Sequence, residues 1–222
     1  MNNLITTNIS KLQYLCSTAA DAKKACLGGA DWIQLRIKNA DAVAWKQAAE
    51  ETLIVCREFG AKLIINDNTA LAYETGADGV HLGKDDMPPE EARLLLGKDA
   101  LIGGTANTFE DIVRLNKARV DYIGLGPYHY TDTKKNLSPV LGIEGYVPLV
   151  KQCRRAGIAI PLIAIGGIRK EAITFLLHTG VHGIAVSSAI TDSTDIQEET
   201  KLFLETINTF DPHGEQDLSA GR

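Results

Sequence analysis

The sequence predicts an α/β protein with a single domain, a (β/α)₈ barrel. Short apolar runs of high β propensity alternate eight times with helical patterns along the chain. Several helical patterns end in a glycine turn that leads straight into the next apolar run, as at residues 76–79 and 180–183. No linker-like stretch or change in composition divides the 222 residues, and eight β/α units in this length match a compact TIM barrel.

The expected strands are short, as buried parallel strands are. In chain order they cover residues 12–16, 32–35, 62–65, 79–82, 100–103, 121–125, 161–165 and 183–186. The expected helices cover residues 20–27, 41–58, 69–75, 89–96, 108–118, 144–156, 170–179 and 197–207. Each strand is followed by a helix, which is the connection that parallel neighbours require.

The main alternative is an open, doubly wound sheet, which usually carries a Gly-x-Gly-x-x-Gly turn after an early strand. The sequence has no such turn. We therefore expect residues 1–210 to form the barrel. Residues 211–222 are polar and contain proline and glycine, and we expect them to be a disordered tail.

Composition narrows the range of partners. The net charge is −5, and no block of lysine and arginine is interleaved with aromatic residues, so we expect no nucleic-acid partner. No apolar stretch approaches the roughly 18 residues of a membrane span, and no signal-peptide pattern is present, so a cytoplasmic location is expected. The four cysteines are scattered, as reduced structural thiols are, and only Cys16 stands where it could border a pocket at a strand end.

Polar side chains follow the second expected strand, and catalytic groups of a barrel come from such strand ends. Gln34, Arg36 and Lys38 alternate with Leu35 and Ile37, so the three polar side chains share one side. Burying unpaired cations costs roughly several kcal/mol, so a purely structural role for Arg36 and Lys38 is hard to support. An internal salt-bridge ladder is the structural alternative. The pattern favours a phosphate or diphosphate site.

Acidic residues follow the third and fourth expected strands. Asp67 comes after Asn66, and Asp86 closes the segment after the fourth strand. Carboxylates on adjacent barrel strands can share one cation, and oxygen ligands without a histidine or cysteine cluster favour Mg²⁺ held jointly with a diphosphate. For Asp67 alone, the alternative is a helix N-cap.

A second anion site is indicated by three later segments. Thr131, Asp132, Thr133 and Lys134 follow the sixth strand, although an exposed loop explains that pattern equally well. The glycine pair ending at Gly167 and the serine pair Ser187 and Ser188 follow the last two strands, where barrels commonly bind phosphate. Packing alone is the alternative for the glycines. The histidines form no catalytic arrangement, and His81 is interpreted as a core residue.

Together these segments resemble the thiamine phosphate synthase family, also called thiamine-phosphate pyrophosphorylase, from the first strand to about residue 207. The segments that carry the resemblance are Ile-Gln-Leu-Arg-Ile-Lys at 33–38, Ile-Ile-Asn-Asp at 64–67, Gly-Val-His-Leu-Gly at 79–83, Asp-Tyr-Ile-Gly-Leu-Gly-Pro at 121–127, Thr-Asp-Thr-Lys at 131–134 and Ala-Ile-Gly-Gly-Ile at 164–168. Each is weak alone, but they occur jointly and in the family's order.

The resemblance implies a transferase that joins hydroxymethylpyrimidine diphosphate to hydroxyethylthiazole phosphate, or to its carboxylated form, giving thiamine phosphate and diphosphate. It implies that the pyrimidine diphosphate is held by Gln34, Leu35, Arg36, Ile37, Lys38, Asn66, Thr105 and Lys134. The thiazole phosphate would be held by Thr131, Asp132, Thr133, Gly167, Ser187 and Ser188. It further implies Mg²⁺ on Asp67 and Asp86, and catalytic roles for Arg36, Lys38 and Lys134.

In the implied mechanism diphosphate leaves first, and the thiazole nitrogen captures the resulting pyrimidine-methyl cation, so no strong general base is needed. Three segments depart from the family's usual pattern. Thr105 and Asn107 stand where Ser and His are usual, Lys84 replaces Gln, and Tyr130 replaces Pro. Asn107 cannot be protonated, and Lys84 adds a charge beside the expected metal.

Other functions remain open at this stage. A related thiazole tautomerase tends to lack the metal-binding acids and to carry His where Pro127 stands. A different phosphate-binding barrel, such as a sugar-phosphate isomerase or epimerase, is a second alternative, and a non-catalytic sensor of phosphate ligands is a third. The sequence leaves open whether the protein forms a homo-oligomer.

Overall fold

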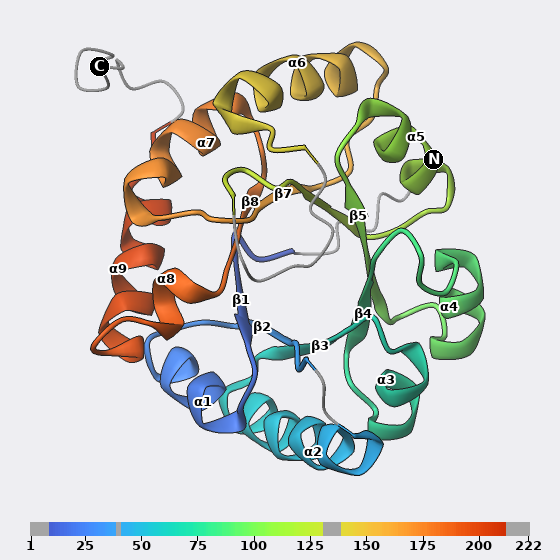
Figure 1. Cartoon of the computed structure of the whole chain (residues 1–222), viewed down its shortest axis with the longest axis vertical. Coiled ribbons are helices and arrows are strands. Elements are labelled where there is room, and N and C mark those ends of the chain that lie inside the picture. Colours follow the sequence, from blue (N-terminus) through green and yellow to red (C-terminus); the bar gives the residue numbers. More distant parts are fainter. Residues whose placement is uncertain (1–8, 39–40, 131–138, 212–222) are drawn as a thin grey trace.

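A computed structural model of the chain describes residues 9–38, 41–130 and 139–211. Eight parallel strands close into a barrel in the order β1-β2-β3-β4-β5-β6-β7-β8. Figure 1 looks down this barrel and shows the helices as a ring around it. Strand β8 pairs with β1, which closes the sheet and leaves it without a free edge. The structure confirms the (β/α)₈ barrel.

The elements alternate as the sequence predicts. The strands are β1 (Leu12–Cys16), β2 (Trp32–Leu35), β3 (Lys62–Asn66), β4 (Gly79–Leu82), β5 (Leu101–Ala106), β6 (Tyr122–Leu125), β7 (Leu162–Ile165) and β8 (Gly183–Val186). The helices are α1 (Ala19–Leu27), α2 (Ala42–Phe59), α3 (Thr69–Thr75), α4 (Pro89–Leu96), α5 (Phe109–Lys117), α6 (Gly142–Arg155), η1 (Lys170–Ala172), α7 (Ile173–Thr179), α8 (Ser188–Thr191) and α9 (Ile196–Asn208).

Most boundaries agree with the prediction within two residues, and three differences stand out. Strand β5 continues to Ala106, which places Thr105 inside the strand, because two glycines interrupt the apolar run from which the strand was inferred. The expected helix over 170–179 begins with the 3₁₀ turn η1. The short helix α8 was not predicted, since four residues carry no helical periodicity. Residues 212–222 of the expected tail lie outside the described residues.

Local chemistry explains where the helices start and stop. Side chains of Asp41 and Thr108 accept hydrogen bonds from the first turns of α2 and α5, as N-cap residues do. Gly76 and Gly180 adopt left-handed conformations just past α3 and α7, with φ of 70° and 96°. Glycine is suited to this conformation because it has no Cβ. These turns return the chain to the next strand.

The barrel has two apolar cores. The larger lies between the strands and the helices. The smaller fills the barrel interior and consists of Ile9, Leu15, Trp32, Ile64, Leu101, Tyr122, Ile163 and Ala185, with Ile165 packed against it. Within it, the rings of Trp32 and Tyr122 meet edge to face with centroids 4.7 Å apart. The interior is therefore filled by side chains, as expected for an eight-stranded barrel.

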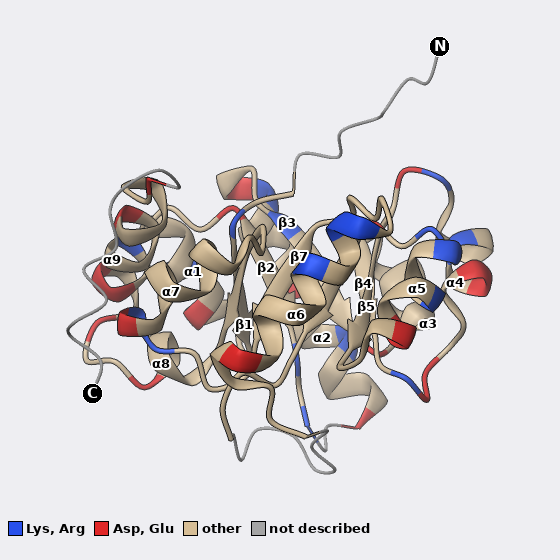
Figure 2. Cartoon of the chain, turned by 90° about the horizontal axis from the view of Figure 1, so that it is seen from above, with Lys and Arg blue, Asp and Glu red and all other residues tan. Residues whose placement is uncertain are grey.

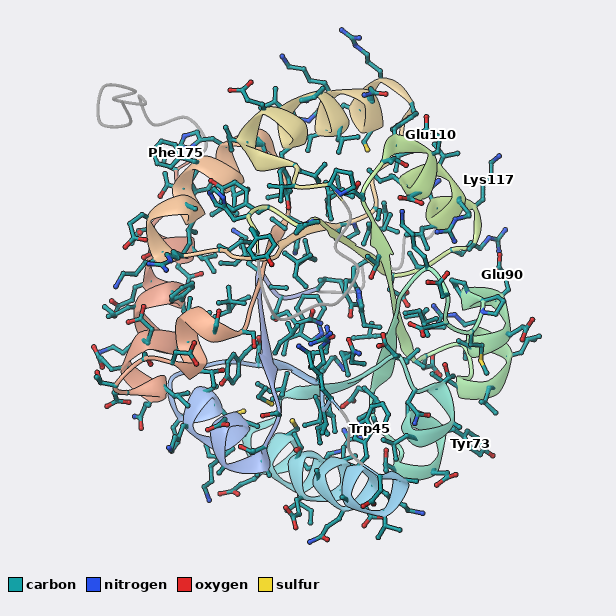
Figure 3. The ribbon with its side chains drawn as sticks, viewed as in Figure 1. Trp45, Tyr73, Glu90, Glu110, Lys117 and Phe175 are labelled. Atoms are coloured by element: carbon teal, nitrogen blue, oxygen red, sulfur yellow. The ribbon has the colours of Figure 1, made fainter. Side chains whose placement is uncertain are left out.

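The outer surface is polar with isolated apolar side chains. Basic and acidic residues both occur on the helices in the view of Figure 2. Tyr73 on α3 and Phe175 on α7 lie at the outer rim of the ring (Figure 3), with 61% and 44% of their surface exposed. Among the described residues, no helix has the length and apolar character needed to cross a membrane.

Candidate active site

A cavity of about 370 Å³ lies at the carboxyl ends of the strands. Its lining comes from nearly every part of the barrel and includes Cys16, Ser17, Gln34, Arg36, Lys38, Asn66, Asp67, His81, Thr105, Pro127, Ile165, Gly166, Gly167, Val186, Ser187, Ser188 and Thr191. Residues far apart in sequence thus meet in one pocket, in the position where barrels place their active sites.

The polar side chains after β2 face this cavity as the alternation predicts. Gln34, Arg36 and Lys38 line it, while Leu35 is fully buried in the outer core and Ile37 packs against that core. The backbone N–H of Arg36 donates to the Cys16 carbonyl at 2.8 Å, which continues the β1–β2 pairing beyond the strand end. Two cations are therefore held on one wall of the pocket, whereas Leu35 and Ile37 do not bring their side chains into it.

The two expected metal ligands lie together. Asp67 lines the cavity, and Asp86 lies within hydrogen-bonding reach of it. The pKa of Asp67 is raised to about 6, chiefly by removal from bulk water and then by the hydrogen bond and negative charge of Asp86. The positive charge of Arg36 acts in the opposite sense. Two carboxylates this close favour a bound proton or a cation.

Backbone geometry fixes both acids. Asp67 has a left-handed backbone with φ of 62°, uncommon for a residue other than glycine. The carboxylate of Asp86 accepts a hydrogen bond of 2.6 Å from the backbone N–H of Gly83. The N-cap of α3 is Asn68, whose side chain accepts from the Leu71 N–H at 2.9 Å. The helix-cap interpretation of Asp67 is therefore wrong.

These acids suit Mg²⁺ only if other ligands complete the coordination. In the part of the chain that the structure describes, no group of three or more His, Cys, Asp or Glu residues could hold a metal ion. Mg²⁺ usually takes one or two carboxylates and fills its remaining positions with water and substrate phosphates. The raised pKa of Asp67 shows that burial and the neighbouring Asp86 outweigh the positive charge of Arg36. The donor set fits a metal that arrives with a diphosphate.

Two of the unusual residues have structural partners. The Lys84 ammonium pairs with the Asp111 carboxylate at 2.7 Å and thereby joins the β4–α4 loop to α5. Lys84 is absent from the cavity lining. The charge of Lys84 is thus paired with an acid of α5, and the expectation that it adds charge beside the metal stays a prediction. The side-chain amide of Asn107 donates to the carbonyls of Gly126 and Pro139, both at 2.9 Å, and so ties the segments before and after the β6–α6 loop.

The glycine pair after β7 allows two loops to approach closely. Gly166 and Gly167 have φ of 97° and 64°. A Cβ on Gly166 would lie 2.7 Å from Pro127, and one on Gly167 would lie 2.8 Å from His129. The backbone N–H of His129 donates to the Gly166 carbonyl at 2.9 Å. Packing therefore accounts for these glycines, and Gly167 also lines the cavity.

The two serines after β8 have different structural roles. The Ser187 hydroxyl donates to the Leu15 carbonyl at 3.0 Å, whereas Ser188 begins the short helix α8. Ser188 and Gly167 also border a second, wider cavity of about 1100 Å³ that reaches Tyr130, Arg169 and other residues of the neighbouring loops. The two cavities thus meet at the position expected for a monophosphate.

Some predicted site residues lie outside the described part of the chain, and some residues of the cavity were not predicted from the sequence. Thr131, Asp132, Thr133 and Lys134 lie outside the described residues, so their predicted roles stay predictions. Ser17 and Thr191 line the cavity but were not predicted. Ser17 follows a strand end, which is the same signal that identified the others. His81 was interpreted as a core residue, yet it is both buried and part of the cavity wall.

Comparison with known proteins points to one family. A family profile described as thiamine monophosphate synthase matches residues 3–190. The thiamine-phosphate synthase of Bacteroides fragilis is 48% identical over 200 residues, which cover 90% of this chain and 96% of that protein. A thiamine-phosphate synthase of Flavobacterium johnsoniae is 45% identical over 205 residues, with 90% and 95% covered.

A solved structure supports the same assignment. Thiamine phosphate pyrophosphorylase from Pyrococcus furiosus superposes with a TM-score of 0.79 at 32% sequence identity, covering 89% of this chain and 95% of that one. The family profile extends over most of the chain, and the named relatives match it nearly end to end. The chain belongs to the thiamine monophosphate synthase family.

Proposed function

We propose that the chain catalyses the reaction for which its relatives are named, the synthesis of thiamine phosphate. The substrates are hydroxymethylpyrimidine diphosphate and hydroxyethylthiazole phosphate or its carboxylated form, and the second product is diphosphate. The observation that carries the proposal is that Arg36, Lys38 and Asp67 line one cavity, with Asp86 beside Asp67. A tautomerase that transfers no diphosphate has no need of that combination.

The diphosphate group binds along the wall formed by β2 and β3. The Arg36 guanidinium offers a fork of N–H donors to phosphate oxygens, and the Lys38 ammonium adds a mobile point charge. Asn66 from β3 and Thr105 from β5 add an amide and a hydroxyl to the lining of the same cavity. Lys134, which lies outside the described residues, is proposed to complete this set. These groups stabilise the negative charge that grows as the diphosphate departs.

Asp67 and Asp86 are proposed to hold Mg²⁺. When bound, the ion supplies positive charge that neutralises the leaving diphosphate. The acids themselves are preorganised for this role, because the Gly83 N–H fixes one carboxylate and the strained backbone of Asp67 fixes the other. No proton needs to be taken from either substrate in the bond-forming step.

The thiazole phosphate is proposed to bind where the two cavities meet. Gly167 and Ser188 border both, and Ser187 lies beside them. Thr131, Asp132 and Thr133 are assigned to the same ligand and lie outside the described residues. Holding the thiazole ring beside the pyrimidine methylene converts a bimolecular capture into a local one, which is the largest contribution such a site can make without a strong base.

The decisive experiment is direct. Purified protein is incubated with both substrates and Mg²⁺, and thiamine phosphate is detected by chromatography. Formation of the product supports the proposal. Its absence at full Mg²⁺ occupancy contradicts the proposal and leaves the thiazole tautomerase and the non-catalytic sensor, which substrate isomerisation and ligand-binding assays separate. Turnover of a sugar phosphate instead would show a different phosphate-binding barrel.

The metal assignment has its own test. Asp67→Ala and Asp86→Ala are expected to lower Mg²⁺-dependent turnover at least about 100-fold, in line with removal of a group that stabilises the transition state, with thermal unfolding little changed. Asp85→Ala is the matched control, because Asp85 is adjacent in sequence, whereas Asp86 is the acid that the Gly83 N–H holds and that contacts Asp67. Equal rates in the Asp86 and Asp85 variants would show that the assignment is wrong.

The proposal also places the enzyme in the cytoplasm, where small phosphorylated substrates are made and consumed. It requires small-molecule substrates and no nucleic-acid or membrane partner. A homo-oligomer is compatible with it, because the cavity opens at one end of a single barrel. Sedimentation of the purified protein measures the oligomeric state, and turnover of a monomer would show that one chain suffices.

A further inference from the structure

Beneath the cavity, buried polar side chains form one continuous hydrogen-bonded chain across the barrel interior. Gln34 Nε2 donates to Gln13 Oε1 at 2.8 Å, and Gln13 Nε2 donates to the Tyr122 hydroxyl at 3.1 Å. The Tyr122 hydroxyl is 3.2 Å from His81 Nδ1, and His81 Nε2 is 3.1 Å from the Thr105 hydroxyl. The two ends, Gln34 and Thr105, line the cavity.

The middle of this chain is removed from solvent. Gln13, Gln34 and Tyr122 are each at most 1% exposed, and His81 is 6% exposed. Buried polar groups are costly unless their hydrogen bonds are made, so each member restricts the orientation of the next. The proposed function assigns no role to Gln13, Tyr122 or His81, and Gln13 and Tyr122 are absent from the cavity lining.

The strands leave room for this arrangement. A Cβ on Gly103 would lie 2.2 Å from Tyr122 and 2.5 Å from His81 Nδ1. A Cβ on Gly124 would lie 3.0 Å from the His81 ring. A side chain at either position would separate the ring from its partners. The barrel interior is therefore shaped around the contact between Tyr122 and His81.

The direction of the hydrogen bonds can be followed from one end. The Tyr122 hydroxyl accepts from Gln13, and burial raises the pKa of Tyr122 well above its ordinary value, so the proton stays on the phenol. That proton is then available to His81 Nδ1. A neutral imidazole that accepts at Nδ1 carries its own proton on Nε2, and this proton points to Thr105.

We propose that Gln13, Tyr122 and His81 act as a positioning relay that keeps the Thr105 hydroxyl proton directed into the cavity, toward an anionic substrate. Because Thr105 Oγ accepts from His81, its single proton is left for a ligand. At the other end, Gln34 uses one amide proton on Gln13 and keeps its carbonyl and second proton for the cavity. The inference rests on the proposed function for the identity of the ligand, but the direction of the relay can be measured without turnover.

The first test measures the His81 tautomer in the unmodified protein. Protein labelled with ¹⁵N-histidine is observed by long-range ¹H–¹⁵N correlation at pH 8, and the His81 signals are assigned by their loss in His81→Gln. Protonated Nε2 with unprotonated Nδ1 is the expected result. A proton on Nδ1, or on both nitrogens, overturns the relay whether or not the protein makes thiamine phosphate.

The second test removes one hydroxyl. Tyr122→Phe keeps the ring packed on Trp32 but deprives His81 Nδ1 of its donor. The expected results are loss of the single tautomer and a fall of about three- to tenfold in kcat/KM for the pyrimidine diphosphate, the size of one lost hydrogen bond. The KM for the thiazole phosphate should be unchanged. An unchanged tautomer, or equal losses for both substrates, contradicts the proposal.

The matched control is Tyr146→Phe, which removes another buried hydroxyl, one that donates to the Leu125 carbonyl at 2.5 Å. It should cost stability without altering the His81 tautomer. Two changes at His81 provide an independent check. The Gln side chain in His81→Gln can still donate to Thr105, so this variant should retain more activity toward the pyrimidine diphosphate than His81→Leu. Equal activities would contradict a relay that ends on Thr105.

Discussion

Asp67 carries two unfavourable features at once, a left-handed backbone and a carboxylate beside another carboxylate. Strained backbone of this kind costs roughly 1–3 kcal/mol and persists where the surrounding structure enforces it, often at functional sites. The cap of α3 is supplied by Asn68, so Asp67 is not needed there. What the strained residue provides is a carboxylate aimed at the cavity.

This electrostatic strain predicts that Asp67→Asn stabilises the metal-free protein at neutral pH. The pKa of Asp67 is about 6 in the folded protein against 3.8 normally. The protonated carboxyl of Asp67 therefore stabilises the fold fully below pH 3.8, and this stabilisation is lost as the pH rises through 6. Asp67 is exposed, and after discounting for solvent screening the gain is about 1 kcal/mol, or about 2–4 °C.

Thermal unfolding in EDTA measures this gain. The difference between Asp67→Asn and the unmodified protein should be clear at pH 7.5 and much smaller at pH 5. Added Mg²⁺ should raise the melting temperature of the unmodified protein and leave the variant almost unchanged. A variant that is less stable at pH 7.5 without metal would contradict the raised pKa.

Gly83→Ala is expected to weaken the binding of Mg²⁺ without unfolding the protein. The new Cβ would lie 2.9 Å from Asp86 Oδ2, so the carboxylate must move away from the Gly83 N–H. The backbone of Gly83 is not among the positive-φ positions, so alanine fits locally. The Mg²⁺ concentration for half-maximal rate should rise about 10-fold, as for loss of a group that orients a ligand. An unchanged value would show that this hydrogen bond does not position Asp86.

At the scale of elements, Asn107 joins the end of β5 to both sides of the β6–α6 loop. Its side-chain amide is the donor to the carbonyls of Gly126 and Pro139. One amide makes both bonds and carries no titratable group. Asn107 therefore provides a link between these elements.

Asn107→Ala is expected to destabilise the fold by about 1–3 kcal/mol, because the carbonyls of Gly126 and Pro139 lose their donor. Turnover should fall as well, since Gly126 and Pro127 line the cavity. Urea unfolding and steady-state kinetics measure the two effects. Asn116→Ala, an exposed position on α5, is the control and should change neither. A loss in stability alone would limit Asn107 to a structural role.

The sequence predicts the elements well because each is local. Alternating apolar runs and glycine turns identify every strand, and cations and acids at strand ends identify the cavity wall. The relay is different. Gln13 and Tyr122 are 109 positions apart, and nothing local distinguishes their hydrogen bond from ordinary burial. Likewise, the pairing of Lys84 with Asp111 depends on how the β4–α4 loop meets α5, so no local pattern predicts this ion pair.

At the scale of the whole molecule, the two ends of the barrel have separate tasks. Opposite the cavity, acids in the turns before strands accept hydrogen bonds from the preceding strand. Asp78 accepts from the Leu63 N–H at 2.9 Å, and Asp121 accepts from the Ile102 N–H at 2.7 Å. Asp121 also pairs with Arg93 at 2.6 Å. Residues at this face of a barrel serve stability.

Asp121→Ala should therefore lower stability and spare catalysis. Loss of the acceptor leaves the buried Ile102 N–H unpaired, which costs about 1–3 kcal/mol. The denaturation midpoint in urea should fall, while kcat measured at a temperature well below unfolding should stay within about twofold of the unmodified enzyme. The control is Asp99→Ala, which changes an exposed acid before β5, the strand that contains Ile102. A large loss of kcat in Asp121→Ala alone would contradict this division.

The buried relay joins two halves of the chain. Gln13, Gln34 and His81 come from β1, β2 and β4, while Thr105 and Tyr122 come from β5 and β6. A fragment ending after β4 would expose unpaired amides and an unpaired imidazole, and a fragment starting at β5 would bury a phenol without partners. The hydrogen bonds are completed only when the two half-barrels dock in the correct register. The groups that prepare the substrate site thus also select the correctly closed barrel over misaligned assemblies of its halves.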